Sequence, residues 1–335
     1  MTTIAIKPGS TYTSIYVSGH GLVLKEPTVA AFDENNRKHV RAVGHEALAM
    51  RGKAPNVTVI SPVSEGVISE PEIFAMMLKC FLDKICPIDA VFRPRYKAIV
   101  AIPLGLSMEE REMYEDVMLD AGIKSVTLVP SVVLSAIGAD LPVGTGNGMI
   151  SVNIGGGRTE VALLSYGGII DGCGVGIGGQ ILDEALVDYT TGKYGVRIGV
   201  DQARKVREEI GSLYDNDKAC MTVGGMNVAS NVPETVNIYA LDVRDVALPY
   251  FMRICDLVKT IIKGCPVNVA NDIMNNGIII TGGVSNIHGI DVLFMEQLGL
   301  PVKIYTRPQY LQIVGAGKLL TNDELMNQLI TGGSV

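Results

Sequence analysis

Three features that mark large classes of protein are missing from this chain of 335 residues. No stretch approaches the roughly 18 consecutive apolar residues that a membrane-spanning helix needs. The segment Met1-Thr2-Thr3-Ile4 leads directly into a predicted strand, without the basic and apolar regions of a signal peptide. No strongly basic block accompanies the net charge of −7, which argues against nucleic acid as a partner. We therefore expect a protein of the cytoplasm.

Paired cysteines are also lacking. The six cysteines are scattered, none of them forms a C-x-x-C pair, and no histidine has metal-ligand spacing beside them. In a cytoplasmic protein this pattern predicts no metal site and reduced, mostly buried thiols. These cysteines are Cys80, Cys86, Cys173, Cys220, Cys255 and Cys265.

What the chain does contain is an ordinary globular composition, with 47% hydrophobic and 19% charged residues. Its length is sufficient for two domains or lobes with substantial cores. Short β-rich runs alternate with helical patterns, which indicates an α/β fold. The segment Leu141–Asn147 is rich in glycine and proline and is the predicted boundary between the lobes.

Individual elements follow from local signals. A capping box at Ser107-Met108-Glu109-Glu110 predicts a helix that runs to about Asp120 and is closed by Gly122. A hairpin is predicted around Tyr166-Gly167-Gly168, between strands Glu160–Leu164 and Ile169–Gly172. The other predicted elements are strands Lys97–Ile102, Val126–Val129, Met149–Ile154 and Ile278–Ile280, a hairpin at Met221–Met226, and helices Ser131–Ile137, Gln180–Tyr189, Gln202–Ile210, Asp242–Lys263 with a bend at Pro249, and a last helix that includes Gly315–Leu320.

Two β-turn-β segments of the chain share the same sequence pattern, and they are its one internal similarity. The first covers Ile4–Tyr16 and the second Ser151–Val161, and each has an apolar strand, a polar residue, a glycine turn and a returning strand. Superposing them places Lys7 on Asn153. Glycine turns let backbone N–H groups converge on phosphate oxygens, so we predict the two halves of a nucleotide clamp, one opening each lobe and facing the other across a cleft. Magnesium at such a site usually needs carboxylates, which neither polar position supplies.

Several short motifs occur in the order and at the spacing found in one family. They are Leu24–Val29 (LKEPTV), Glu65–Ile68 (EGVI), Ala136–Val143 (AIGADLPV), Ile154–Val161 (IGGGRTEV), Thr281–Gly283 (TGG) and Gly315–Lys318 (GAGK). With them the chain resembles the MreB family of bacterial actin homologues over nearly its whole length. The resemblance implies an actin-like α/β fold with two lobes, each a β-sheet flanked by helices.

The resemblance also implies where the lobes lie. It places the first lobe at residues 1–143 plus 312–335, with a small inserted subdomain at about 30–66. The second lobe covers residues 144–311, with a small subdomain at about 181–240.

The chain departs from the family where the chemistry of ATP hydrolysis takes place. Lys7 and Asn153 stand where the family has the aspartates of its two phosphate loops, and Ser131 stands where it has the glutamate that orients the attacking water. Removing one such group commonly lowers the rate on the order of 100- to 1,000-fold, although losses within one site are not additive. We therefore predict a degenerate ATPase with no intact catalytic residue.

Nucleotide binding is a separate expectation, because the glycine turns persist. The resemblance implies ATP or ADP as ligand, without clear support for magnesium, and the residues in contact are expected to be Gly9, Ser10, Thr11, Thr13, Gly155, Gly156, Gly157, Arg207, Gly282 and Gly283. Two alternatives stay open for Lys7: its ammonium neutralises phosphate directly, or it points to solvent. Pro8 offers no N–H, and Tyr12 is bulkier than its family counterpart and is expected to crowd the γ-phosphate position.

A loop of the first lobe corresponds to the segment through which MreB proteins contact the membrane. It carries Ile88, Val91 and Phe92 beside Arg93 and Arg95. Apolar tips flanked by cations suit an anionic bilayer, which would give peripheral contact with the inner face of the cell membrane. The alternative is that the three apolar side chains pack beneath the loop.

Partners and function follow only from the resemblance. It implies a cytoskeletal or scaffolding protein of the cell-shape machinery that forms head-to-tail filaments with itself, and that associates with an active MreB or a cell-shape complex. Two alternatives stay open. The first is an active ATPase with displaced acids, such as Glu65 or Glu160, and the second is a non-polymerising adaptor that binds a partner protein.

Overall fold

The structure of the protein is a computed structural model that describes residues 2–34, 36–86 and 94–334. Its chain divides into two compact units. The first contains residues up to Asn147, the segment Leu164–Gly174, and Tyr310 onward, and the second contains Gly148–Leu163 and Val175–Gln309. Among the described residues, no helix combines the length and the apolar character needed to cross a membrane.

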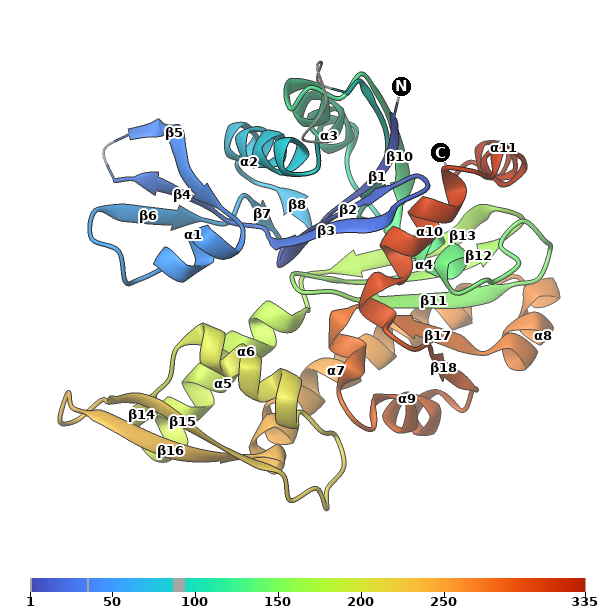
Figure 1. Ribbon diagram of the computed structural model, residues 1–335. Coiled ribbons are helices and arrows are strands. Elements are labelled where there is room, and N and C mark those ends of the chain that lie inside the picture. Colours follow the sequence, from blue (N-terminus) through green and yellow to red (C-terminus); the bar gives the residue numbers. More distant parts are fainter. Residues whose placement is uncertain (1, 35, 87–93, 335) are drawn as a thin grey trace. The chain divides into compact units, whose positions relative to one another are not determined.

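The main sheet of the first unit has the strand order β10-β9-β1-β2-β3. Figure 1 labels all of these strands except β9. Strand β1 is parallel to β9 and β9 to β10, whereas β1, β2 and β3 form an antiparallel meander. The strands are β1 (Thr2–Pro8), β2 (Tyr12–Val17), β3 (Gly21–Pro27), β9 (Tyr96–Ile102) and β10 (Ser125–Pro130). The helices of this unit are α1 (His45–Met50), α2 (Pro71–Lys84), α3 (Met108–Asp120), α4 (Ser131–Gly138), α10 (Leu311–Leu319) and α11 (Asp323–Thr331).

Alternation along β1 gives this sheet two buried faces. Ile4 and Ile6 are fully buried in one cluster with Phe74 of α2 and Tyr114 of α3. On the other side, α10 packs so closely that a Cβ added at Gly317 would lie 2.7 Å from the Tyr16 ring. Helices α10 and α4 also meet through glycines, because a Cβ at Gly315 would collide with the Leu134 carbonyl oxygen and one at Gly138 with that of Leu311. The GAGK motif is therefore a helix-packing motif.

Smaller elements complete the first unit. A sheet of order β5-β4-β6 is formed by β4 (Ala30–Asp33), β5 (Asn36–Val43) and β6 (Val57–Ile60). Strands β7 (Val63–Ser64) and β8 (Val67–Ile68) make a hairpin whose two turn residues, Glu65 and Gly66, both have positive φ. Strand β13 (Gly168–Val175) follows the predicted turn at Tyr166-Gly167, where φ is again positive at both residues.

In the second unit, strands lie in the order β12-β11-β17-β18, with β11 parallel to β17 and β17 to β18. They are β11 (Met149–Ile154), β12 (Thr159–Ser165), β17 (Ile278–Thr281) and β18 (Val302–Ile304). A second sheet, β14-β15-β16, contains β14 (Val196–Arg197), β15 (Cys220–Asn227) and β16 (Pro233–Tyr239). The helices are α5 (Gly179–Tyr194), α6 (Val200–Ile210), α7 (Ala240–Gly264), α8 (Val267–Asn276) and α9 (Ile290–Leu298), with short 3-10 turns at Gly283–Asn286 and Pro308–Tyr310.

Three expectations about local structure are wrong. Met221–Met226 is no hairpin but the middle of β15, which pairs along its length with β16. The helix around Gly315 is not the last one, because α11 follows it. The cysteines are free but not mostly buried, since Cys255 is buried, Cys220 is exposed and the other four are intermediate. The helix predicted at Asp242–Lys263 is confirmed as α7, which continues through Pro249, and the bend at that residue stays a prediction.

Candidate functional site

The first glycine turn joins β1 to β2. A Cβ at Gly9 would lie only 2.7 Å from the Tyr12 carbonyl oxygen, so the turn needs glycine at this position. The Thr28 hydroxyl donates a hydrogen bond to the Gly9 carbonyl oxygen at 2.6 Å, and the Thr28 N–H donates to that of Thr11 at 3.0 Å. The segment after β3 therefore fixes the shape of this turn.

The hydroxyls of the first turn are held within the fold. The Ser10 Oγ accepts a hydrogen bond from the Gly66 N–H at 2.8 Å, and the Thr13 and Thr28 hydroxyl oxygens lie 3.0 Å apart. Ser10 and Thr13 are both buried. Their role in the structure is to position the turn, and the Ser10 contact brings the Glu65-Gly66 turn beside it.

The replaced acid positions of the first unit lie on two elements. Lys7 is half-buried on β1 opposite Ser14, and Ser131 is the buried first residue of α4. Tyr12 lies on β2 with its ring centroid 4.7 Å from the Lys25 Nζ. The same ammonium lies 4.8 Å from the Tyr310 ring, so Lys25 is held between two aromatic rings.

The glycine turn of the second unit is bonded to the start of α5. The Gly155 N–H donates to the Arg158 carbonyl oxygen at 2.9 Å, which closes the turn. The N–H groups of Gly179 and Gln180 donate to the carbonyl oxygens of Gly155 and Gly156 at 3.0 and 2.7 Å. These first amides of the helix would otherwise lack intrahelical partners, so the turn and the helix satisfy each other.

Asn153 belongs to a buried polar cluster behind this turn. Its Nδ2 donates a hydrogen bond to Glu160 Oε2 at 2.9 Å, and its Oδ1 lies 3.5 Å from the Thr281 hydroxyl oxygen. Asn153, Glu160 and Thr281 are 5%, 2% and 0% exposed. Gly282 has φ +94, and a Cβ there would clash with the Ile154 carbonyl oxygen and lie 2.8 Å from Asn153 Oδ1. Gly283 is exposed, and a Cβ there would meet only Gln309, at 4.0 Å.

Arg207 was predicted to contact nucleotide, and its guanidinium is bound within the fold. Its Nε lies 2.6 Å from Asp183 Oδ1 and its Nη2 lies 3.3 Å from Asp183 Oδ2. Both side chains are almost fully buried, at 6% and 0% exposure. This forked ion pair joins α6 to α5. Sequence reasoning missed Asp183, because no local signal pairs residues on two different helices.

A second polar cluster ties α5 to the start of α7. The buried Asp242 carboxylate accepts hydrogen bonds from the Lys193 ammonium at 2.6 Å, the Tyr194 hydroxyl at 2.7 Å and the Tyr239 N–H at 2.9 Å. Burial and the bond to Asp242 raise the pKa of Tyr194 to about 12. Burial alone would raise the pKa of Asp242, but the Lys193, Tyr239 and Tyr194 donors hold it below its usual value.

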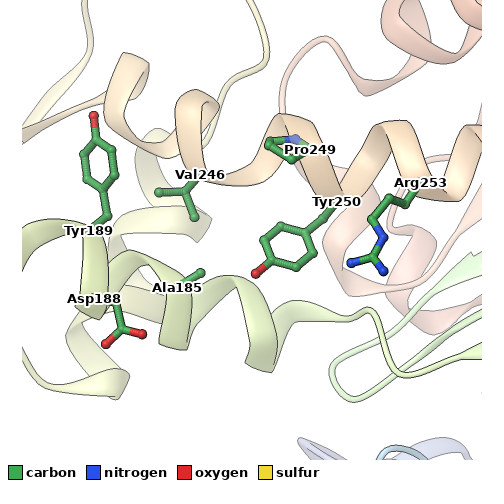
Figure 2. A pocket seen from close by; sticks show the side chains of 7 residues that line it. All are labelled: Ala185, Asp188, Tyr189, Val246, Pro249, Tyr250 and Arg253. Carbon is green, nitrogen blue, oxygen red and sulfur yellow. The ribbon is translucent and has the colours of Figure 1, made fainter.

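An open pocket of about 530 Å³ lies between the same two helices (Figure 2). Its lining is mainly apolar and includes Val246, Pro249 and Tyr250 of α7 and Ala185 of α5. None of the nucleotide-binding residues predicted from the sequence lines this pocket.

The predicted site residues therefore gather within each unit. The structure brings Gly9, Ser10, Thr11 and Thr13 together in the first unit, and Asn153 with Gly155–Gly157 and Gly282 in the second. Among the described residues, no three histidine, cysteine, aspartate or glutamate side chains are placed to hold a metal ion. The predicted membrane residues Ile88, Val91 and Phe92 lie outside the described residues, so that prediction stands as made.

Comparison with known proteins gives consistent matches. A family profile described as MreB/Mbl protein matches residues 1–328. The cell shape-determining protein MreB of Escherichia coli (strain K12) is 34% identical over 322 residues, covering 95% of this chain and 92% of that protein. The cell shape-determining protein Mbl of Bacillus subtilis (strain 168) is 30% identical over 321 residues, covering 95% and 96%.

Solved structures resemble the chain equally broadly. The crystal structure of MreB5 of Spiroplasma citri bound to AMPPNP has a TM-score of 0.90 and 28% identity, covering 99% of this chain and 98% of that one. The MamK double helical filament has a TM-score of 0.80 at 17% identity, covering 95% and 98%, which bears on the fold alone. The predicted actin-like α/β fold is confirmed.

Proposed function

The chain belongs to the MreB/Mbl protein family, and from this premise we propose that it is a cell-shape cytoskeletal protein that binds adenine nucleotide without hydrolysing it. In this proposal it acts as a nucleotide-bound scaffold that assembles with copies of itself in the cytoplasm. Its family membership supports the cytoskeletal role, and its own residues support the loss of catalysis.

One observation carries the proposal: the environment of the replaced acids. Asn153 donates a hydrogen bond to Glu160, so the carboxylate that follows the second turn on β12 is buried and already bonded. Lys7 and Ser131 add no carboxylate in the first unit. Phosphoryl transfer depends on positioning and charge neutralisation, and these replacements remove groups that supply both. Glu65 is exposed on the tight turn between β7 and β8.

Retention of the glycine turns supports nucleotide binding. The related MreB5 of Spiroplasma citri has been solved with AMPPNP and with ADP, at TM-scores of 0.90 and 0.89. In this chain we assign the phosphate contacts to the backbone of Gly9–Thr11 and Gly155–Gly157, and the adenosine contacts to Gly282 and Gly283. Arg207 is assigned a supporting role, because Asp183 holds its guanidinium.

Calorimetric titration with ATP, in EDTA and in magnesium, tests the binding. We expect binding in both buffers, with little gain from magnesium. Gly283→Val should weaken binding at least about tenfold, because it adds bulk at an exposed turn, while changing thermal stability little, since a Cβ there would meet Gln309 at 4.0 Å, an ordinary contact distance. Absence of binding heat in the wild type would contradict nucleotide binding. Unaltered affinity in Gly283→Val would contradict the assignment of adenosine contacts to Gly283.

Self-assembly is tested by sedimentation and negative-stain microscopy over a range of protein concentrations. We expect filaments above a critical concentration, with ADP and ATP acting alike because no hydrolysis separates the two states. A chain that remains monomeric throughout would contradict this part of the proposal and favour the non-polymerising adaptor.

A further inference from the structure

The family implies a magnesium ion beside the bound nucleotide, and the residues around Asn153 do not fit one. A cation needs oxygen lone pairs directed at it. Here the Asn153 Nδ2 presents an N–H donor to Glu160 Oε2 at 2.9 Å, so a cation at this position would compete with a hydrogen bond for the same oxygen. The other end of the amide, Oδ1, faces the Thr281 hydroxyl at 3.5 Å and the Gly282 backbone.

We propose that the Asn153 amide takes the place of a cation beside Glu160, so that the second glycine turn keeps its form without metal. A carboxylate that is 2% exposed needs polar partners that compensate its charge, and the Asn153 amide N–H is one such partner that is not an ion. The contact joins the end of β11 to β12 across the turn Gly155–Arg158, so it holds the two sides of the turn together. This inference rests on the proposed function, but its test uses no nucleotide, so the two can fail separately.

The inference predicts what restoring the acid would do. Asn153→Asp changes the shape of the side chain very little, but it replaces the N–H donor by an oxygen 2.9 Å from a second carboxylate. Two buried carboxylates at this distance cannot both stay ionised, so they share a proton or bind a cation. The variant should therefore acquire the cation and pH dependence that the wild type lacks.

Thermal unfolding of the full chain is the test, measured in EDTA, in magnesium chloride and in manganese chloride between pH 6 and 8. In EDTA at pH 8 we expect Asn153→Asp to unfold about 5 °C below the wild type. Either cation, or a fall in pH, should recover most of the loss. Asn153→Ala removes the donor without adding a carboxylate, so its lowered midpoint should not respond to cations. Asn153→Asp with Glu160→Gln should lose the cation response.

Two results would overturn the inference. One is an Asn153→Asp variant whose midpoint matches that of the wild type in every buffer. The other needs no new acid: a magnesium-dependent rise in the wild-type midpoint that Glu160→Gln abolishes would show that the natural pair already holds a cation. This second measurement decides the question even if Asn153→Asp does not fold, and neither result depends on whether the chain binds ATP.

Discussion

Asp242 illustrates how one buried carboxylate joins two helices. Its donors come from the last turn of α5 and from the residue that precedes α7. Because these donors favour the charged form, the pKa of Asp242 in the folded chain lies below its unfolded value, although burial opposes this. The carboxylate therefore adds stability above the unfolded pKa of about 4, and this contribution is lost as the pH falls through the folded pKa.

The lowered pKa of Asp242 leads to a prediction for Asp242→Asn. At pH 7 the variant should be less stable than the wild type by about 1–3 kcal/mol, because charged hydrogen bonds are lost from a buried site. Urea unfolding between pH 7 and 3 should show the difference shrinking below about pH 4. Asp256→Asn is a matched control on the same helix, since Asp256 is 69% exposed and its pair with Lys259 contributes little. A difference that persists undiminished at pH 3 would contradict the assignment.

Gly282 and Gly283 are neighbours with opposite requirements. Gly282→Ala should lower the free energy of unfolding by at least about 2 kcal/mol, because φ +94 is strained for alanine and its Cβ would clash with Ile154. Gly283→Ala should change stability by less than about 0.5 kcal/mol, since the added methyl would meet the Gln309 Cβ at 4.0 Å, an ordinary contact distance. Chemical denaturation of both variants checks the pair, and equal effects would show that the turn relaxes around either residue.

Strand β15 shows, at the scale of an element, why a glycine pair is an ambiguous signal. Gly224-Gly225 resembles a hairpin turn in sequence, yet both residues lie inside a strand paired with β16. A Cβ at Gly225 would lie 2.6 Å from both the Arg197 carbonyl oxygen and the Val196 Cγ1. A Cβ at Gly224 would have no atom of another described residue within 4 Å, apart from its two chain neighbours. The reason for glycine is a close approach by β14, a contact that local sequence does not reveal.

The two glycines of β15 should therefore respond differently to alanine. Gly225→Ala is expected to destabilise the second unit by about 1–3 kcal/mol by forcing β14 away. Gly224→Ala should be neutral or stabilising by up to about 1 kcal/mol, because it restricts the unfolded chain at no steric cost. Thermal melts of the two variants distinguish these outcomes, and a larger loss for Gly224→Ala would contradict the register.

Local sequence signals predicted most helices and strands. The side-chain contacts of the candidate site could not be predicted, because they join residues of different elements. The Ser107 capping box is present as predicted, with Glu110 N–H bonded to the Ser107 Oγ at 3.2 Å, because all its atoms lie within one turn. The glycine turns were recognised for the same reason. The pairings Asn153–Glu160 and Arg207–Asp183 join separate elements, so the sequence showed the residues and not their partners. Helix α11 was missed although Asn322 caps it and Leu325, Met326, Leu329 and Ile330 follow at helical spacing, because a pattern of only nine residues is a short signal.

At the scale of the whole molecule, the family fold is kept, whereas we propose that ATP hydrolysis is lost. The chain keeps the fold of its family over nearly all its length, and the proposed loss of turnover rests on three positions, Lys7, Ser131 and Asn153. A filament whose subunits bind nucleotide without hydrolysing it has no chemical step to drive disassembly. We therefore expect its filaments to persist after ATP is added, and to disassemble on dilution at a rate independent of the age of the filament.

Phosphate release from ATP by assembled protein tests the central claim most directly. We predict release no faster than the buffer background, in magnesium and in EDTA, under conditions in which calorimetry shows the nucleotide to be bound. The contradicting result is steady phosphate release by an ATPase activity that co-purifies with the chain and is lost in Glu65→Gln or Glu160→Gln. That dependence would identify an intact catalytic acid. Contaminating ATPase would survive both substitutions, so the two variants separate it from activity of the chain itself.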